Sequence, residues 1–229
     1  QQNADKCKQR TERSGFEQID EETVTLQHLD SRILKEPAFA IENAIHEVVH
    51  MGKITQENME RAFDAALSYD KEKIDKVYEV ETTINNMEKL ITEYLVKLSN
   101  LPLTEDQHMV VNDLFYSVSD IERVGDHIEN VAELVDVKEG TPKIEFSEQA
   151  LKDLEQIMDL VMKSFVFAMS AREHSDITDA TKVVKYEDMV DNMEEELREQ
   201  HIERLSKQLC KPTNGVVFLD IISNLERIS

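Results

Sequence analysis

Residues 119–130 read SDIERVGDHIEN and decide the fold class, because they combine an apolar stripe with an acidic stripe at helical spacing. The acidic residues follow one another at steps of four, three and four: Glu122, Asp126, Glu129 and Glu133. Residues three and four apart lie on one face of a helix, where like charges repel by about 0.2–0.5 kcal/mol per pair. The stretch therefore predicts a helix whose acidic face is either solvated or occupied by a cation.

Composition extends the helical prediction to the whole chain. The 229 residues include only 5 Gly and 4 Pro, and 40% of them are hydrophobic, so long helices can bury a sizeable core. The formal net charge is −22. Because nucleic acids are bound through basic surfaces, this charge excludes them as partners and favours cations or basic proteins.

Cysteine usage and hydropathy indicate the kind of cellular compartment in which the chain is expected to lie. Cys7 and Cys210 lie far apart and match no zinc-finger or CxxC spacing, which is typical of a reducing compartment. No apolar run approaches the roughly 20 residues of a membrane span. The sequence begins without Met and stops within a periodic apolar run, so we expect it to be a piece of a longer protein.

Periodicity and capping signals divide the chain into three parts. We predict an N-terminal linker over 1–36, a first three-helix bundle over 37–142 and a second over 143–229. The expected helices cover about 37–69, 71–99, 105–140, 147–172, 178–209 and 213–229, and Gly52 is expected to bend or interrupt the first. Since short connections join long helices, the predicted fold is all-α with antiparallel neighbours.

An internal repeat relates the two predicted bundles. Residues 80–88, VETTINNME, match residues 186–194, YEDMVDNME, at an offset of 106. Residues 119–124, SDIERV, match residues 223–228, SNLERI, at an offset of 104. Two matches in the same order at nearly one offset indicate two copies of one three-helix unit.

The repeat keeps acidic or amide side chains four residues apart in both halves. The pairs are Glu81/Asn85, Glu122/Asp126 and Glu187/Asp191, with Glu226 followed by Ser229. In the second and third helices these residues come one position after the apolar residues, so each stripe is expected to border the core and face its neighbour across a groove. Gly125, within the apolar stripe, would allow the helices a close approach. Such oxygen ligands suit Mg²⁺, Ca²⁺, Mn²⁺ or iron. The alternative is a solvated surface, which does not require acidic residues at matching positions in both halves.

Residues 122–127, ERVGDH, resemble the signature of the PhoU family, Leu/Ile-Glu-Arg-Ile-Gly-Asp-His. That family consists of two three-helix bundles whose paired E(D)xxxD motifs bind multinuclear metal clusters at the surface. The resemblance implies iron, zinc, manganese or magnesium as the bound ion. The implied ligands are Glu81, Asn85, Glu122 and Asp126 in one site and Glu187, Asp191 and Glu226 in the other, supported by Glu88, Glu129 and Glu194.

A second resemblance concerns the segment upstream. Residues 29–38, LDSRILKEPA, resemble the segment that joins the membrane part of bacterial sodium/phosphate cotransporters to their C-terminal PhoU-like domain. This implies a non-enzymatic regulatory domain at the cytoplasmic face of the membrane, with the transmembrane portion of the cotransporter as partner and phosphate as a further ligand. The alternative is a free-standing PhoU-like accessory protein, and association between copies of the chain stays open in both.

Two positions depart from the family pattern. Asn85 stands where a carboxylate is expected, which removes one charge from the first site. The second signature stops at Ser229, where the family continues with Asp-His, so the second site is expected to lack a ligand.

Two histidine motifs suggest other metal chemistry. Residues 46–50, HEVVH, have the zinc-protease form, but no third ligand follows at a familiar spacing, and we expect surface positions there. Glu47/His50 and Glu105/His108 both have the ExxH form of di-iron carboxylate bundles. Glu105, however, falls in the first turn of its helix, where the helix dipole explains its charge, so a di-iron enzyme is the weaker alternative.

Overall fold

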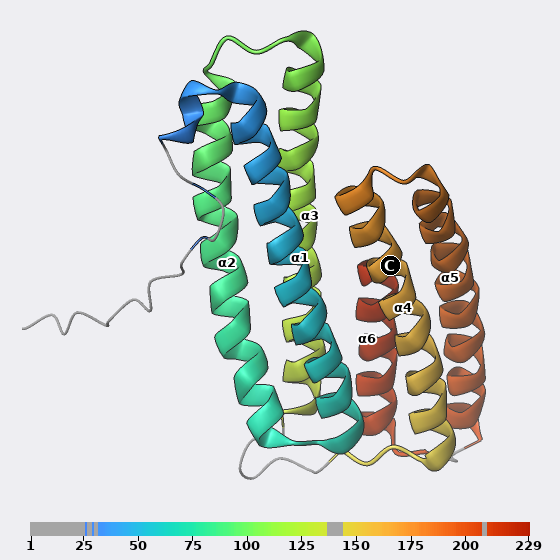
Figure 1. The fold of residues 1–229 in the computed structure, drawn as a ribbon. Coiled ribbons are helices and arrows are strands. Elements are labelled where there is room, and N and C mark those ends of the chain that lie inside the picture. The colour runs from blue at the N-terminus through green and yellow to red at the C-terminus, as the bar shows by residue number, and fades with distance from the viewer. Residues whose placement is uncertain (1–25, 27–28, 30–31, 137–143, 208–209) are drawn as a thin grey trace, which may run out of the picture.

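A computed structural model of the chain describes residues 26, 29, 32–136, 144–207 and 210–229. All regular structure in these ranges is helical. The elements are η1 (Ile33–Lys35), α1 (Pro37–Ser68), α2 (Lys71–Ser99), α3 (Glu105–Val135), α4 (Glu148–His174), α5 (Ile177–Ser206) and α6 (Pro212–Ile228). Figure 1 shows two sets of three long helices side by side, α1–α3 and α4–α6. This confirms the predicted all-α fold of two three-helix units.

The helix boundaries follow from local capping. The Thr104 hydroxyl accepts from the Gln107 N–H while the Gln107 side chain accepts from the Thr104 N–H, which forms a capping box at the start of α3. Ser147 caps α4 by accepting from the Ala150 N–H. Val135 ends α3 about five residues before the expected Gly140, and Asp136 leaves the helical conformation.

The repeat is visible in the connections as well as in the helices. Tyr69 and Ser175, 106 positions apart, both adopt left-handed backbone conformations, with φ of 57° and 53°, and each ends the first helix of its set. Asp70 and Asp176 follow them, and both cap the next helix through side-chain carboxylates. The two sets therefore have the same helix-capping residues and backbone conformations at matching positions of the repeat.

Gly52 does not interrupt α1, contrary to the expectation. The helix is continuous, and the side chain of Met169 on α4 occupies the space that a Cβ at position 52 would need. Gly52 thus allows the two sets to approach each other closely. Most of the predicted linker over 1–36, and the predicted boundary near 142, lie outside the described residues.

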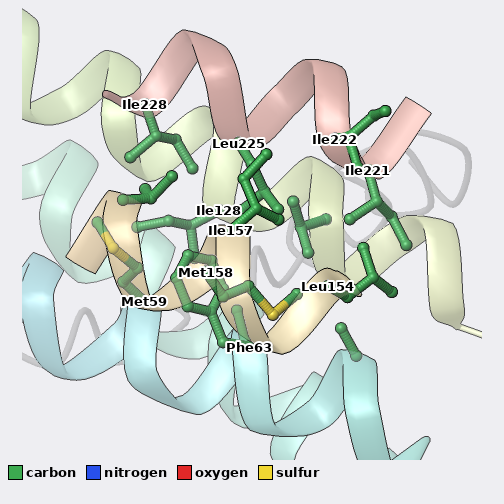
Figure 2. Packing of buried hydrophobic residues seen from close by; sticks show 14 of the residues in the cluster. Met59, Phe63, Ile128, Leu154, Ile157, Met158, Ile221, Ile222, Leu225 and Ile228 are labelled. Carbon is green, nitrogen blue, oxygen red and sulfur yellow. The ribbon is translucent and has the colours of Figure 1, made fainter. Parts of the chain in front are cut away.

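The hydrophobic core forms two clusters, one of which is shared by the two sets. The first lies within α1–α3 and includes Met51, Ile84 and Leu114. The shared cluster, drawn in Figure 2, joins residues of α1 and α3 to residues of α4 and α6; its labelled members are Met59, Phe63, Ile128, Leu154, Ile157, Met158, Ile221, Ile222, Leu225 and Ile228. Consequently α1 packs on α4 and α3 on α6, with α2 and α5 at the outer sides (Figure 1).

No helix in the described ranges has both the length and the apolar character that a membrane crossing requires.

Candidate metal-binding surface

Glu81 lies at the centre of the first acidic stripe, and it is buried. Its side chain is 1% exposed, and neither carboxylate oxygen has a hydrogen-bond partner in the part of the chain that the structure describes. It faces Gly125 of α3, since a Cβ at position 125 would lie 2.7 Å from Glu81 Oε2. The absence of a side chain at Gly125 creates the space that the carboxylate fills.

This burial differs from the prediction that Glu81 borders the core. Val80 is half-buried, whereas Glu81 itself occupies the core position between Val77 and Ile84. The spacing of 77, 81 and 84 follows the helical repeat, and that spacing was the signal that could have revealed the burial. The prediction depends on Val80 as the core residue, with Glu81 one position after it, and the structure reverses the two positions.

Electrostatics connect Glu81 with the stripe on α3. Burial, and after it the charges of Glu129, Asp126 and Glu122, raise the pKa of Glu81 to about 8. Burial and then the Asp126 charge also raise the pKa values of Glu122 and Glu129. The carboxylates are thus close enough to repel one another, and a bound cation would lower the pKa values of all three glutamates.

The remaining residues of the first stripe lie on the same seam. Asn85 and Glu88 are half-buried on α2, and Glu88 accepts a hydrogen bond of 3.2 Å from the Thr92 hydroxyl. The Glu88 charge contributes to the raised pKa of Glu122, which places the two helices' acids near each other. Asp126 is exposed. The structure therefore gathers the predicted residues of the first half along the contact of α2 with α3.

The second stripe has a different environment. Glu187 and Asp191 of α5 and Glu226 of α6 line one groove of about 520 Å³. Three cationic or ionisable groups line it too: Arg123 and His127 from α3, and Arg227 from α6. Glu194, the predicted supporting residue, forms an ion pair with Arg198.

Two residues of the first-half signature lie beside the second stripe, which the helical periodicity does not predict. His127 Nδ1 lies 3.0 Å from Asn224 Oδ1, a contact between residues 97 positions apart. Arg123 and His127 belong to the ERVGDH signature of the first half, yet they line the groove of the second. This arrangement follows from the packing of α3 on α6, which periodicity alone does not reveal.

Neither stripe forms a finished coordination shell. Among the residues that the structure describes, no three His, Cys, Asp or Glu side chains are arranged as a metal-ligand set. The acids instead follow the helices in line. Ligation at either stripe requires side chains to turn toward a common ion.

The two histidine motifs do not converge on a ligand set either. His46 is exposed, but Glu47 is fully buried and lies 3.0 Å from His50 Nδ1, so the expectation of surface positions is wrong for Glu47. Glu105 and His108 are exposed at the start of α3. Glu47 is buried because it lies on the inward face of α1, where Val48 and Met51 are buried as well.

Fold and surface together define a class: helical proteins of two repeated three-helix units with acidic stripes along paired helices. The family model described as "PhoU domain" matches residues 48–135 and 154–229, one segment in each half. The chain belongs to the PhoU family.

The relatives in sequence include PhoU accessory proteins and longer phosphate export proteins. The PhoU homolog 1 of Thermotoga maritima, a phosphate-specific transport system accessory protein, is 25% identical over 80% of this chain and 78% of its own length. YjbB of Salmonella typhimurium, a candidate inorganic phosphate export protein, is 22% identical over 88% of this chain, which spans only 37% of YjbB.

Solved structures show the same fold. The crystal structure of PhoU from Streptococcus pneumoniae has a TM-score of 0.74 at 23% identity, with 84% of this chain and 89% of that chain covered. PhoU from Pseudomonas aeruginosa has a TM-score of 0.76 at 22% identity, with 82% and 90% covered.

Proposed function

We propose that this protein regulates phosphate transport as a PhoU-like accessory protein, acting through contacts with a transport protein and not through catalysis. The observation that carries this proposal is the PhoU match in both halves of the chain. The accessory role named for the Thermotoga relative, which covers most of both chains, supports it. This favours the free-standing alternative over the cotransporter domain as the first candidate.

Metal binding at the two acidic stripes is the second element of the proposal. Glu81 supports it, because a buried carboxylate without hydrogen-bond partners is stabilised by a nearby cation. Glu122, Asp126 and Glu129 on α3 would supply further oxygens, and Glu187, Asp191 and Glu226 would do so in the second groove. The donors suit iron, manganese or magnesium, and also zinc. A bound ion supplies positive charge to which phosphate or a partner's carboxylate can bind.

Elemental analysis tests the metal proposal. Protein purified without chelator is expected to carry a transition metal or Mg²⁺, and Glu81→Gln combined with Glu122→Gln is expected to reduce the bound amount by half or more. Glu79→Gln is the matched control, because Glu79 is exposed on α2 and paired with Lys76. Metal content equal in all three proteins would contradict the proposal.

Phosphate uptake tests the regulatory role. Deleting the gene is expected to change the rate of phosphate uptake at high external phosphate, and the wild-type gene is expected to restore it. The Glu81→Gln/Glu122→Gln variant is expected to restore it incompletely, whereas Glu79→Gln is expected to restore it fully. Uptake unchanged by the deletion would contradict the role.

A second candidate is a regulatory domain within a sodium/phosphate cotransporter at the cytoplasmic face of the membrane. It is favoured by the YjbB match, in which this chain spans 37% of a longer protein, and by the resemblance of residues 29–38 to a cotransporter joining segment. Immunoblotting of the native protein decides between the candidates. A membrane-bound product far above 26.5 kDa supports the cotransporter domain, and a product near that mass supports the accessory protein.

A further inference from the structure

The two halves differ at one end, where α4 and α6 begin and α5 ends (Figure 1). In the first half, Leu95 and Leu98 of α2 are fully buried in the core, and Thr104 caps α3. The repeat offset of 106 places His201 and Arg204 of α5 at the positions of the two leucines. The second half thus has two nitrogen-bearing side chains where the first half has an apolar core.

These side chains line a cavity of about 330 Å³ between α4, α5 and α6. Other polar residues that line it are Glu145, Ser147, Cys210, Lys211 and Asn214. Glu145 is the one acid among the described lining residues, in a chain whose net charge is −22. Two cationic side chains, Arg204 and Lys211, thus line the cavity with one acid, and the buried Asp153 carboxylate lies near Arg204.

Two nitrogens at the cavity have no hydrogen-bond partner among the described residues. His201 is 5% exposed, and its Nδ1 is buried without a partner. Arg204 Nη2 is also buried without a partner, while Nη1 lies 3.5 Å from Asp153 Oδ2. Charge-assisted hydrogen bonds of this kind are usually about 2.7–2.9 Å, so the Asp153 contact leaves the guanidinium poorly satisfied. Buried polar groups of this kind normally have a protein, water or ion partner.

The start of α6 adds the backbone N–H groups of Thr213 and Asn214 as donors, since Pro212 at the first position has none. Lys211 is the N-cap residue, no side chain in the described residues caps the helix, and its first turn contains no acid. The positive end of a helix dipole disfavours a lysine there and favours a bound anion. The corresponding end of α3 has the Thr104 capping box and Glu105 and Asp106 in its first turn. Its own side chains therefore cap the free N–H groups and place negative charge at the positive end of the helix dipole.

We propose that this cavity binds a small oxyanion, held by the side chains of Arg204 and Lys211 and by the first-turn N–H groups of α6. His201, stacked on Phe218 with ring centroids 4.9 Å apart, forms one wall of the cavity, and its Nδ1 is buried without a partner among the described residues. Inorganic phosphate is the oxyanion that the proposed function would supply, and only this identity rests on the proposed function. His201 lies ten residues along α5 from Asp191, about 15 Å, so the site is distinct from the acidic groove.

Cys210 offers a direct readout, because it lines the cavity and lies 4.0 Å from His201 Nε2. In a Cys7→Ser background Cys210 is the single thiol of the chain. Inorganic phosphate is expected to slow the reaction of Cys210 with N-ethylmaleimide in a saturable way at constant ionic strength. Chloride is the control anion, and sulfate is the second oxyanion.

Substitutions of the lining residues test whether the protection of Cys210 by phosphate arises at this cavity. Lys211→Gln is expected to raise the half-protecting phosphate concentration about two- to fivefold, as for an exposed charge. Arg204→Met is expected to raise it about tenfold or more, as for a charged hydrogen-bond donor. Lys207→Gln is the matched control, since Lys207 is exposed one turn away and paired with Glu203. If Arg204→Met fails to fold, as circular dichroism would reveal, Lys211→Gln still decides the question.

Each outcome bears on the proposal. Protection by phosphate and sulfate alike supports a general oxyanion site and removes the preference for phosphate. Absence of protection by both anions, or equal protection of wild type and Lys211→Gln, overturns the site. Protection that persists in chelator supports this cavity, whereas protection lost in chelator assigns the anion to a metal at the acidic stripes and overturns it. If deletion of the gene leaves phosphate uptake unchanged, the proposed function is contradicted, but oxyanion binding at this cavity is not.

Discussion

At the scale of single residues, Glu81 carries most of the proposed metal chemistry. It is a carboxylate in a core position, without hydrogen-bond partners among the described residues and with three acids of α3 nearby. With a pKa of about 8, it holds a proton at neutral pH in the metal-free protein. A metal ion would take the place of that proton, because both neutralise the same buried charge.

Metal-free protein is expected to lose stability as the pH rises from about 4.5 to about 8. The folded state keeps the Glu81 proton up to about pH 8, whereas the unfolded chain releases it near 4.5, so folding is favoured at the lower pH. Glu81→Gln removes this contribution and is expected to stabilise the protein at pH 8 by about 1–3 kcal/mol.

Urea unfolding in chelator at pH 5 and pH 8 measures the effect. Glu79→Gln, exposed on the same helix, should keep the wild-type pH dependence. A pH dependence in Glu81→Gln as steep as that of the wild type would argue against a protonated Glu81.

Helices α2 and α3 approach each other closely because residue 125 is glycine. A Cβ there would lie within 2.7–3.2 Å of three atoms of the Glu81 carboxylate. The pairing of a buried acid with a facing glycine is thus a property of the two helices together and not of either alone.

Gly125→Ala is expected to displace the Glu81 carboxylate and to destabilise the metal-free protein by about 1–3 kcal/mol, because overpacking outweighs the alanine's better helix propensity. Thermal unfolding followed by circular dichroism measures it. Combining it with Glu81→Ala should relieve the clash and restore part of the stability. Additive effects of the two substitutions would show that they do not meet.

Helix α5 has the fewest buried residues of the long helices. Only Val190, Leu197 and His201 of its 30 residues are buried, whereas α1, of 32 residues, has 15 buried positions. Backbone amides of α5 are therefore expected to exchange with deuterium faster than those of α1 and α3. Hydrogen exchange followed by mass spectrometry checks this, and added metal should slow the exchange around Glu187 and Asp191 if the second stripe binds it.

At the scale of the whole molecule, the two repeated units share one core. Met59 and Phe63 of α1 pack with Leu154 and Ile157 of α4, so the apolar face of each set is covered by the other (Figure 2). Separation of the sets would expose this face to water, which the hydrophobic effect opposes.

The protein is accordingly expected to unfold in one cooperative transition despite its repeat. Ile221→Ala on α6 should destabilise the whole protein by about 2–5 kcal/mol and lower that single transition without splitting it. Differential scanning calorimetry provides the test, since equal van't Hoff and calorimetric enthalpies indicate one transition. Two resolved transitions would mean that the halves unfold independently.

Much of this architecture could be predicted from local signals. The helix starts expected near 71, 105 and 147 are confirmed by the structure, and the 106-residue offset reappears in the caps of α2 and α5. Glu47 was misplaced on the surface, and Glu81 beside the core, because an acid's burial depends on which helix covers it. The supporting role predicted for Glu194 stays a prediction, and in the structure Glu194 is paired with Arg198 one turn away.

By itself, the sequence determined the six helices, their repeat and the spacing of the acids, because caps, helix breakers and helical periodicity act over a few neighbouring residues. Only the tertiary structure decided that Glu81 meets Gly125, that Arg123 and His127 face the second stripe, and that His201 and Arg204 border a cavity instead of a sealed core. These contacts join residues on different helices. Their geometry depends on how the helices pack side by side, and no local pattern in the chain specifies that.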